Sequence, residues 1–381
     1  MSSDPYQAWD PRSELRGLTA LRGLASILVV MYHFEGVVDA SGATFALGPF
    51  GALVRSGYIA VDLFFILSGV VIAHVYGAKD IGRNGAAYRR FLKHRLARIY
   101  PLHVFVLLAL MVLPLSRAMN GGTFFEGANS PWALLTELLL LDSLGLHDKL
   151  TWNEVSWSIS AEWIAYLAAP LILTLARRGR SARSRSIASG SAAFVALLVL
   201  WAVTENDPTH DFGAVRGVLG FVIGVAVYRL HRDLPVVQLS RRSSTFVGAL
   251  AAVVLLSFLA PNEALYIPSF VVLIVTSVHS SGRLATVLQS RPLVWLGKIS
   301  YSVYLMQSLF LIGLVNASSP LGLDTMSQPG IWLTFIAWLA ALLAISTLTY
   351  RRVEMPAQQM LRARGGSSGS SVSAQQTLRN S

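Results

Sequence analysis

Long apolar runs, separated by short polar or basic segments, recur along the whole chain. They approach the ~20 residues that an α-helix needs to cross the hydrocarbon core of a bilayer. The pattern predicts an all-α polytopic membrane protein with about ten transmembrane helices, at 17–37, 58–76, 100–117, 157–176, 187–203, 212–230, 243–260, 264–279, 296–315 and 330–350. Composition agrees with this prediction, because 54% hydrophobic and 13% charged residues leave too little charge for a soluble protein of 381 residues.

The basic residues are distributed unevenly between the two sides of these predicted helices. If the N-terminus is inside, most of the 31 Lys and Arg residues are cytoplasmic. They fall at Arg12 and Arg16, Lys79 to Arg98, Arg177 to Arg185, Arg229 to Arg242, Arg283 to Lys298 and from Arg351 onwards, whereas Arg55, Arg117 and Lys149 lie outside. Because cytoplasmic loops of membrane proteins carry the excess of Lys and Arg, this asymmetry predicts that both termini are cytoplasmic.

One apolar segment does not fit this topology. The sequence SPWALLTELLLLDSLGL at 130–146 is short, and treating it as an eleventh span would move the basic loop after Arg177 to the outside. We therefore expect a re-entrant or interfacial helix here. The alternative is a short span with a local inversion of the topology.

The spans divide the chain into three parts. Residues 1–15 are expected to form a cytoplasmic N-terminal segment, residues 16–355 the transmembrane domain, and residues 356–381 a disordered, Ser- and Gly-rich cytoplasmic tail. A cleaved signal peptide does not fit the first apolar run, because Arg22 and His33 interrupt it.

Charge and cysteine content exclude several classes of function. The formal net charge of +11 does not indicate nucleic-acid binding, because the basic residues do not form one continuous face. The chain contains no cysteine, which excludes disulfides, thiolate metal sites and a cysteine nucleophile. We expect no metal ion and no nucleic-acid partner, and the sequence does not determine the oligomeric state.

The first apolar run, LTALRGLASILVVMYHF, contains an arginine and a histidine eleven residues apart. At about 100° per residue, a helix presents Arg22 and His33 on one face, roughly 16 Å apart along its axis. Ionisable groups inside a span are energetically expensive and usually face a polar cavity. The pair therefore predicts a functional site inside the membrane domain.

Five segments together resemble the acyltransferase 3 family of bacterial membrane O-acyltransferases. They are the helix with Arg22 and His33, GYIAVDLFFILSGVVIAHVYG from Gly57, RLARIYP from Arg95, WSISAEWIAYLAAP from Trp157 and LGKISYSVYLMQ from Leu296, and their order and spacing match over about residues 16–355. The resemblance implies a ten-helix enzyme of the bacterial plasma (inner) membrane. It would move an acyl group, commonly acetyl from acetyl-CoA, to a hydroxyl of a carbohydrate or glycosylated product.

His33 is the predicted catalytic base or acyl carrier, since imidazole titrates near neutral pH and suits either role. Asp62 and Glu162 are expected at a similar depth, and either carboxylate could orient the imidazole. Depth does not choose between them, although the family resemblance points to Glu162 together with Arg22 and His33. For two of these residues a structural role is the alternative. His33 could be a hydrogen-bonded packing group, and Asp62 could be a carboxylate that reaches interfacial water.

The donor, acyl-CoA, is predicted to dock on the cytoplasmic segment RRFLKHRLARIYP. Guanidinium groups of Arg89, Arg90, Arg95 and Arg98 suit the phosphates of coenzyme A. Arg22 could then anchor a phosphate or carbonyl group of the donor. The alternative is that these cations lie on anionic lipid headgroups.

Three further residues are candidates for substrate contacts. Arg216 could bind substrate or form a structural ion pair with a buried carboxylate. Tyr301 could contact the acceptor, or could simply pack. Gln307 stands where members of this family often have histidine; because glutamine cannot titrate, His33 is left as the only base.

Other functions compete with this prediction. A transporter would use the same polar-faced helix as a pathway and would consume no thioester. A non-catalytic scaffold gives no reason for the register of Arg22 and His33. The acceptor is not specified, although the acidic residues Glu205, Asp207 and Asp211 favour a neutral sugar hydroxyl over a phosphorylated one.

Overall fold

A computed structural model of the protein describes residues 15–77, 79, 81–177, 182–205, 207–209, 211–233, 243–259 and 262–366. Within these ranges the chain folds into helices, and the β pairing is limited to an isolated bridge between Glu126 and Asn129. The longer helices are α1 (Arg16–Ala40), α3 (Ala60–Tyr76), α4 (Gly85–Leu110), α7 (Trp157–Arg177), α8 (Ala182–Val203), α9 (Gly213–Asp233), α11 (Ser243–Leu259), α12 (Ile267–Val278), α14 (Arg291–Leu321) and α15 (Gln328–Thr349). Shorter ones are α2 (Gly51–Arg55), α5 (Val112–Met119), α6 (Pro131–Leu138), α13 (Gly282–Leu288) and α16 (Met355–Gly366).

Each predicted apolar run contains one of the longer helices. Among the described residues, 8 helical stretches are long and apolar enough to cross a membrane. A ninth candidate is a broken pair, in which Glu263–Val278 and Gly282–Leu288 meet at 97°, and α11 is a shorter apolar helix of 17 residues. The prediction of an all-α polytopic membrane protein is confirmed, whereas the cytoplasmic position of both termini stays a prediction.

The segment at 130–146 does not form an eleventh span. Its helix α6 has only 8 residues, which rise about 12 Å, less than half of the hydrocarbon thickness. Leu140 then adopts a positive φ of 56°, which a helix cannot continue through. This segment thus lies outside the set of crossing helices, as a re-entrant or interfacial helix would.

Two helices extend beyond the predicted boundaries. α4 begins at Gly85 rather than near residue 100, because Asn84 caps it by accepting hydrogen bonds from the backbone N–H groups of Ala86 and Ala87 at 3.0 and 3.1 Å. The basic segment is therefore helical and continuous with the span. At the other end, residues 356–366 of the expected tail belong to α16, and the remainder of the tail lies outside the described residues.

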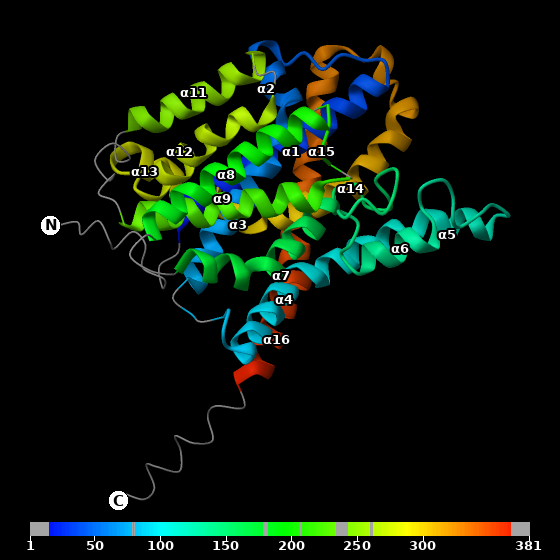
Figure 1. The fold of residues 1–381 in the computed structure, drawn as a ribbon. Helices are drawn as coiled ribbons and strands as arrows, with labels where there is room; N and C mark the ends of the chain where they lie inside the picture. The colour runs from blue at the N-terminus through cyan, green and yellow to red at the C-terminus, as the bar shows by residue number, and fades with distance from the viewer. Residues whose placement is uncertain are drawn as a thin grey trace, which may run out of the picture.

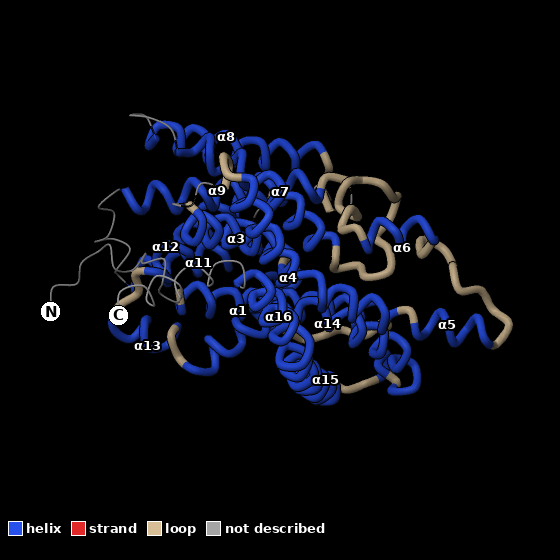
Figure 2. The backbone as a smooth tube through the Cα atoms, turned by 90° about the horizontal axis from the view of Figure 1, so that it is seen from below, coloured by secondary structure: helices blue, strands red, loops and turns tan. Residues whose placement is uncertain are grey.

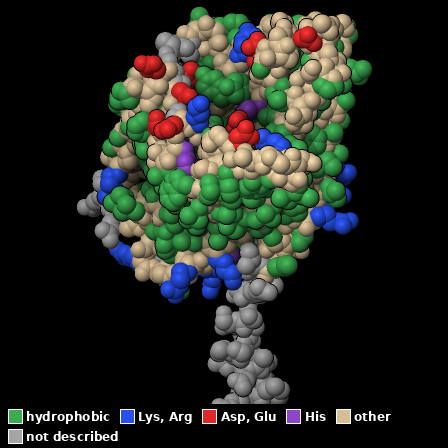
Figure 3. All heavy atoms as spheres, turned by 90° about the vertical axis from the view of Figure 1, so that its right-hand side faces the viewer, with side chains coloured by type: hydrophobic (Ala, Val, Ile, Leu, Met, Phe, Trp, Pro, Cys, Tyr) green, Lys and Arg blue, Asp and Glu red, His purple; other side chains and the backbone are tan. Residues whose placement is uncertain are grey.

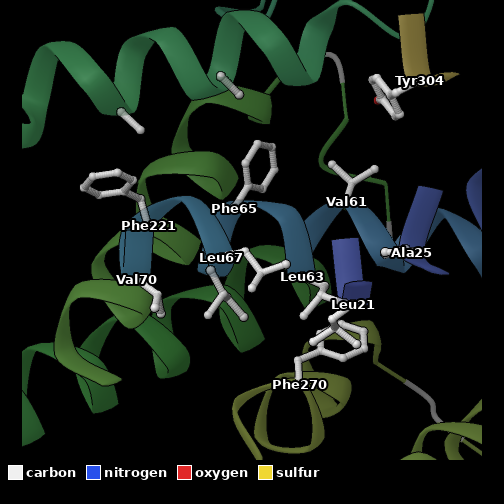
Figure 4. Close-up of a cluster of buried hydrophobic side chains, with 14 of the residues drawn as sticks. Leu21, Ala25, Val61, Leu63, Phe65, Leu67, Val70, Phe221, Phe270 and Tyr304 are labelled. Carbon is white, nitrogen blue, oxygen red and sulfur yellow. The ribbon is translucent and has the colours of Figure 1, made fainter. Parts of the chain in front are cut away.

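Helix α3 lies at the centre of the buried core. Figure 4 shows its side chains Phe65 and Leu67 among residues of α1, α9 and α12. Glycines allow α3 and α9 to approach closely: a Cβ on Gly69 would lie 2.1 Å from the carbonyl oxygen of Phe221, and one on Gly224 would lie 2.1 Å from that of Ile66. Small residues at such contacts are the usual means of packing helices in membranes.

Most of the helices form one main body, from which two short helices project. In Figure 1, α1, α8, α9, α11 and α12 run side by side, and α4 packs against α16. Figures 1 and 2 both show α5 and α6 projecting from the main body.

Figure 3 shows a belt of hydrophobic side chains between a rim of Lys and Arg and a region where Asp and Glu are grouped. Such a surface suits a protein that sits in a bilayer.

Candidate active site

A cavity of about 130 Å³, lined by both apolar and polar side chains, lies between α1, α3, α4, α7 and α14. Its polar lining residues are Arg22, Ser68, Arg95, Arg98, Ser158, Glu162, Tyr166, Ser300, Tyr301 and Tyr304. Three guanidinium groups face a single carboxylate, so the lining carries an excess of positive charge. Charged groups inside a membrane domain cost free energy and therefore indicate a site that binds a polar ligand.

Arg22 projects from α1 and is held by α14. Its Nε and one terminal nitrogen donate to Ser300 Oγ at 3.3 and 3.1 Å, and the same terminal nitrogen donates to the carbonyl oxygen of Gly297 at 3.1 Å. Gly23 permits this contact, because a Cβ there would lie 2.7 Å from the backbone nitrogen of Gly297. The close packing of the two helices thus fixes the guanidinium at the cavity wall.

Arg98 is anchored by an ion pair with Glu354, which follows α15 in the π-helical turn Tyr350–Glu354. Glu354 also accepts a hydrogen bond from Ser302 Oγ at 3.0 Å. The Arg98 guanidinium lies 5.5 Å from the ring centroid of Tyr301. The hydroxyl of Tyr301 donates to the carbonyl oxygen of Ile99 at 2.5 Å, which ties α14 to α4. Tyr301 therefore lines the cavity with its ring while its hydroxyl is used structurally.

Arg95 is the less constrained of the two α4 arginines that line the cavity. Its guanidinium lies 5.6 Å from the ring centroid of Tyr76 and 5.9 Å from that of Tyr166. Its buried Nε has no hydrogen-bond partner among the described residues. A buried donor without a partner costs free energy, so this nitrogen is well placed to donate to a ligand.

The predicted donor site of four arginines is divided by the structure. Arg95 and Arg98 line the cavity, whereas Arg89 and Arg90 are exposed on the first turns of α4 and are not part of its lining. Arg95 and Arg98 are three residues apart on one helix and so project to the same side. The RxxR spacing correctly identified the pair that faces inward.

Glu162 lies with the arginines. It accepts hydrogen bonds from Ser68 Oγ at 2.8 Å and from the hydroxyl of Tyr166. Within the described residues, its carboxylate makes no hydrogen bond to His33. Its neighbours indicate that it balances the charge of the guanidinium groups rather than orienting the imidazole.

Asp62 and Arg216 satisfy each other in a separate buried pair. Arg216 donates from Nε to Oδ1 at 2.8 Å and from a terminal nitrogen to Oδ2 at 2.9 Å, and the two side chains are 1% and 2% exposed. The guanidinium is also enclosed by Trp157 and Trp201, at 5.2 and 4.6 Å from their ring centroids. Arg216 therefore forms the structural ion pair with a buried carboxylate, whereas Asp62 is buried and does not reach interfacial water.

His33 lies in the C-terminal half of α1 and is not among the residues that line the cavity. Its Nδ1 is 2.8 Å from the carbonyl oxygen of Val29. Because a carbonyl can only accept, Nδ1 carries the hydrogen, and Nε2 is left with a lone pair in the neutral ring. A backbone carbonyl one turn away, rather than Asp62 or Glu162, thus sets the tautomer needed for a base.

Gln307 is fully buried on α14, and neither its Nε2 nor its Oε1 has a hydrogen-bond partner among the described residues. It follows Ser300 by seven residues, which places both on one stripe of the helix. Since Ser300 contacts Arg22, this stripe of α14 faces α1. Gln307 therefore lies beyond Ser300 towards the level of His33, with an amide available for a ligand.

A cluster outside the cavity was not predicted from the sequence. Ser156 Oγ lies 2.5 Å from Glu137 Oε1 and 2.9 Å from Asp142 Oδ2, and Thr151 Oγ1 donates to Glu137 Oε2 at 3.2 Å. Burial raises the pKa of Asp142 to about 6 and that of Glu137 well above its ordinary value. The cluster precedes α7 directly, and so supports the entry of that helix. Two carboxylates in an otherwise apolar segment were the signal that could have found it.

No group of three or more metal-ligating side chains occurs in the described part of the chain.

Comparison with known proteins adds an independent finding. The family model described as "Acyltransferase domain" (Acyl_transf_3) matches residues 15–351. The chain is 24% identical over 377 residues to the peptidoglycan O-acetyltransferase OatA of Listeria monocytogenes, covering 91% of this chain and 56% of that protein. It is 33% identical over 189 residues to the acyltransferase MdmB of Streptomyces mycarofaciens, covering 48% and 45% of the two chains.

A third relative is protein 2 in the picA locus of Rhizobium radiobacter, 34% identical over 158 residues, with 39% of this chain and 76% of that protein covered. The chain spans about half the length of OatA and of MdmB. No solved structure matches it.

Proposed function

The chain belongs to the acyltransferase 3 family, and from that membership we propose that it is a membrane-bound O-acyltransferase. It moves an acyl group, which we take to be acetyl, from acyl-CoA to a hydroxyl of a carbohydrate or glycosylated acceptor. The names of two relatives, a peptidoglycan O-acetyltransferase and an acyltransferase, support this chemistry. We place the protein in the bacterial plasma (inner) membrane, as a multi-pass protein.

The observation that carries the proposal is the polarity of α1. At one level Arg22 joins Arg95 and Arg98 around a cavity with excess positive charge. About three turns further along the same helix, or roughly 16 Å, His33 uses Nδ1 to donate to the carbonyl oxygen of Val29, and its Nε2 makes no hydrogen bond among the described residues. A donor with phosphate groups and a long arm ending in a thioester matches a site with cations at one end and a base at the other.

The arginines bind the donor in this mechanism. Guanidinium groups form bidentate, charge-assisted hydrogen bonds with phosphate oxygens. Arg95 has an unsatisfied Nε for such a bond, whereas Arg98 keeps its position through Glu354. The acyl end of the donor then extends along α1 towards Gln307 and His33.

The transfer step uses His33 as a general base. Nε2 takes the proton of the acceptor hydroxyl as the hydroxyl oxygen forms a bond to the thioester carbonyl carbon. The carbon–sulfur bond then breaks, and the imidazolium returns the proton to the departing thiolate. The products are an acyl ester and free coenzyme A, and the histidine is restored.

Replacement of His33 tests this proposal. His33→Ala should reduce acyl transfer by about 10²–10⁴-fold, as expected for removal of a general base. His147→Ala is the control, because His147 lies in the segment after α6 and its ring contacts Thr136 of α6 rather than α1. Since the chain has no cysteine, release of coenzyme A from acetyl-CoA can be followed with a thiol reagent without background from the protein. Full activity in His33→Ala, or flux of a substrate across vesicles without thioester consumption, would overturn the proposal.

A further inference from the structure

Two half-buried tyrosines follow one another from His33: Tyr32 lies beside His33 in the C-terminal part of α1, and Tyr58 lies beside Tyr32. The ring centroid of Tyr32 is 5.0 Å from that of His33 in an edge-on arrangement and 5.4 Å from that of Tyr58. Tyr58 belongs to the short 3-10 helix η3 (Gly57–Ile59). Gly57 makes this approach possible, because a Cβ there would lie 2.7 Å from the carbonyl oxygen of Leu28 and 2.8 Å from Tyr32 Cβ.

Carboxylates surround this aromatic pair. The hydroxyl of Tyr58 donates to Glu263 Oε1 at 2.7 Å, from the 3-10 helix η4 (Glu263–Tyr266). Glu35 and Asp207 lie close enough to Tyr32 to interact with it electrostatically. Four separate segments of the chain thus bring aromatic faces and hydrogen-bond acceptors together next to the candidate base.

On the opposite face of α1, aromatic rings pack against one another in the interior of the protein. There Phe34 is fully buried, and its ring lies 4.9 Å from Phe335, 5.5 Å from Phe45 and 5.3 Å from Trp338. These rings belong to a cluster of buried hydrophobic side chains. Tyr32 and Tyr58 instead combine partial exposure with polar groups, which is characteristic of a binding surface.

We propose that Tyr32 and Tyr58 form an aromatic platform for one pyranose ring of the acceptor, and that this platform presents a ring hydroxyl to His33 Nε2. The proposal rests on the proposed function and specifies its acceptor as a neutral, cyclic sugar. The C–H groups on the face of a pyranose pack against an aromatic ring, whose face is electron-rich. Sugar hydroxyls at the edge of the ring can donate to Glu35, Glu263 and Asp207. Glu35 is paired with Arg55 at 3.6 Å, so Glu263 and Asp207 are the carboxylates that repel acceptors carrying phosphate or carboxylate groups.

Paired acceptors test the platform. Methyl β-D-glucopyranoside offers a ring face, whereas sorbitol offers hydroxyls on an open chain. The wild-type protein should acetylate the glucoside with the lower KM. Tyr32→Leu and Tyr58→Leu should raise the KM for the glucoside about ten-fold, the effect of losing one well-placed aromatic contact, and leave the KM values for sorbitol and acetyl-CoA unchanged. Tyr58→Phe, which keeps the ring, should show the smaller change.

Trp132→Leu is the matched control, because Trp132 is an aromatic residue of α6 that is 54% exposed. It should leave the preference for the glucoside intact. Equal use of the two acceptors by the wild-type protein, or an unchanged glucoside KM in both tyrosine variants, overturns the platform.

A binding measurement separates this inference from the proposed function. Saturation-transfer NMR of methyl β-D-glucopyranoside with the detergent-solubilised protein requires no acyl donor. Signal transfer that is lost in Tyr32→Leu and Tyr58→Leu but kept in Trp132→Leu supports the platform even if acetyl-CoA is not consumed. Signal transfer that persists in both tyrosine variants overturns the platform even if acetyl-CoA is consumed.

Discussion

Two regions of the membrane domain bury arginine and carboxylate side chains, and they do so in opposite ways. Asp62 and Arg216 form a closed pair with two hydrogen bonds and no excess charge. Around the cavity, Arg22, Arg95 and Arg98 outnumber Glu162. The difference teaches that a buried charge marks a binding site only where its partners leave charge or hydrogen-bonding capacity unused.

The largest expected effect comes from breaking the closed pair. Asp62→Ala should destabilise the protein by about 3–5 kcal/mol, because Arg216 would remain buried without a partner. Thermal unfolding in detergent, followed by size-exclusion chromatography, measures the loss. The double variant Asp62→Leu with Arg216→Met should recover most of the stability, and a single variant that unfolds like the wild type would contradict a structural role.

A substitution at the cavity should instead impair donor binding and leave stability nearly unchanged. Arg95→Gln should raise the KM for acetyl-CoA by roughly 10–100-fold while leaving the unfolding temperature nearly unchanged, since one charge-assisted hydrogen bond contributes about 1.5–3 kcal/mol. Arg89→Gln provides the control, because Arg89 is an exposed arginine of the same helix. Equal effects of the two substitutions on the KM would assign donor binding to general positive charge.

Gln307 offers a further test of the difference between closed and unsatisfied polar groups. Its side chain is completely buried, and neither atom of its amide has a hydrogen-bond partner among the described residues. Gln307→Leu should leave stability unchanged or raise it by about 1 kcal/mol, because it removes an unpaired polar group from the interior. Acyl transfer should nevertheless fall. Ser346→Ala is a suitable control, as its buried hydroxyl on α15 also lacks a hydrogen-bond partner among the described residues. A Gln307→Leu protein with full activity would show that the amide makes no contact with a substrate.

The smallest effect should come from the cluster of Glu137 and Asp142, where carboxylates are buried beside each other. Burial raises the pKa of Asp142 from about 3.9 to about 6, so the folded state binds the proton more tightly than the unfolded state. The contribution of Asp142 to the free energy of unfolding should therefore be greatest below about pH 4 and should decrease as the pH rises to about 6.

Unfolding measured between pH 4 and pH 7 tests this expectation. Asp142→Asn should flatten the decrease, whereas Asp148→Asn, at an exposed position, should leave it in place. A steep decrease that survives in Asp142→Asn would assign the titration to another group.

The sequence was sufficient for several features of the fold and of the site. Apolar runs of bilayer length predicted the helices because the hydrocarbon core dictates both their length and their composition. Helical periodicity predicted that Arg22 and His33 share one face, but of these two only Arg22 lines the cavity. The RxxR spacing predicted that Arg95 and Arg98 lie on one side of α4, and both line the cavity. These features depend on contacts within one helix, which local sequence specifies.

Only the tertiary structure decided how the ionisable groups are combined. From depth in the membrane alone, Asp62 and Glu162 were equally possible partners for His33. In the structure, the packing of α3 against α9 pairs Asp62 with Arg216, and α7 places Glu162 beside Ser68. The carbonyl of Val29 orients His33 instead. The sequence therefore determined which polar groups enter the membrane and on which helix face. Their pairing depended on the rotation and close approach of helices distant in sequence, which glycines permit and which no local pattern encodes.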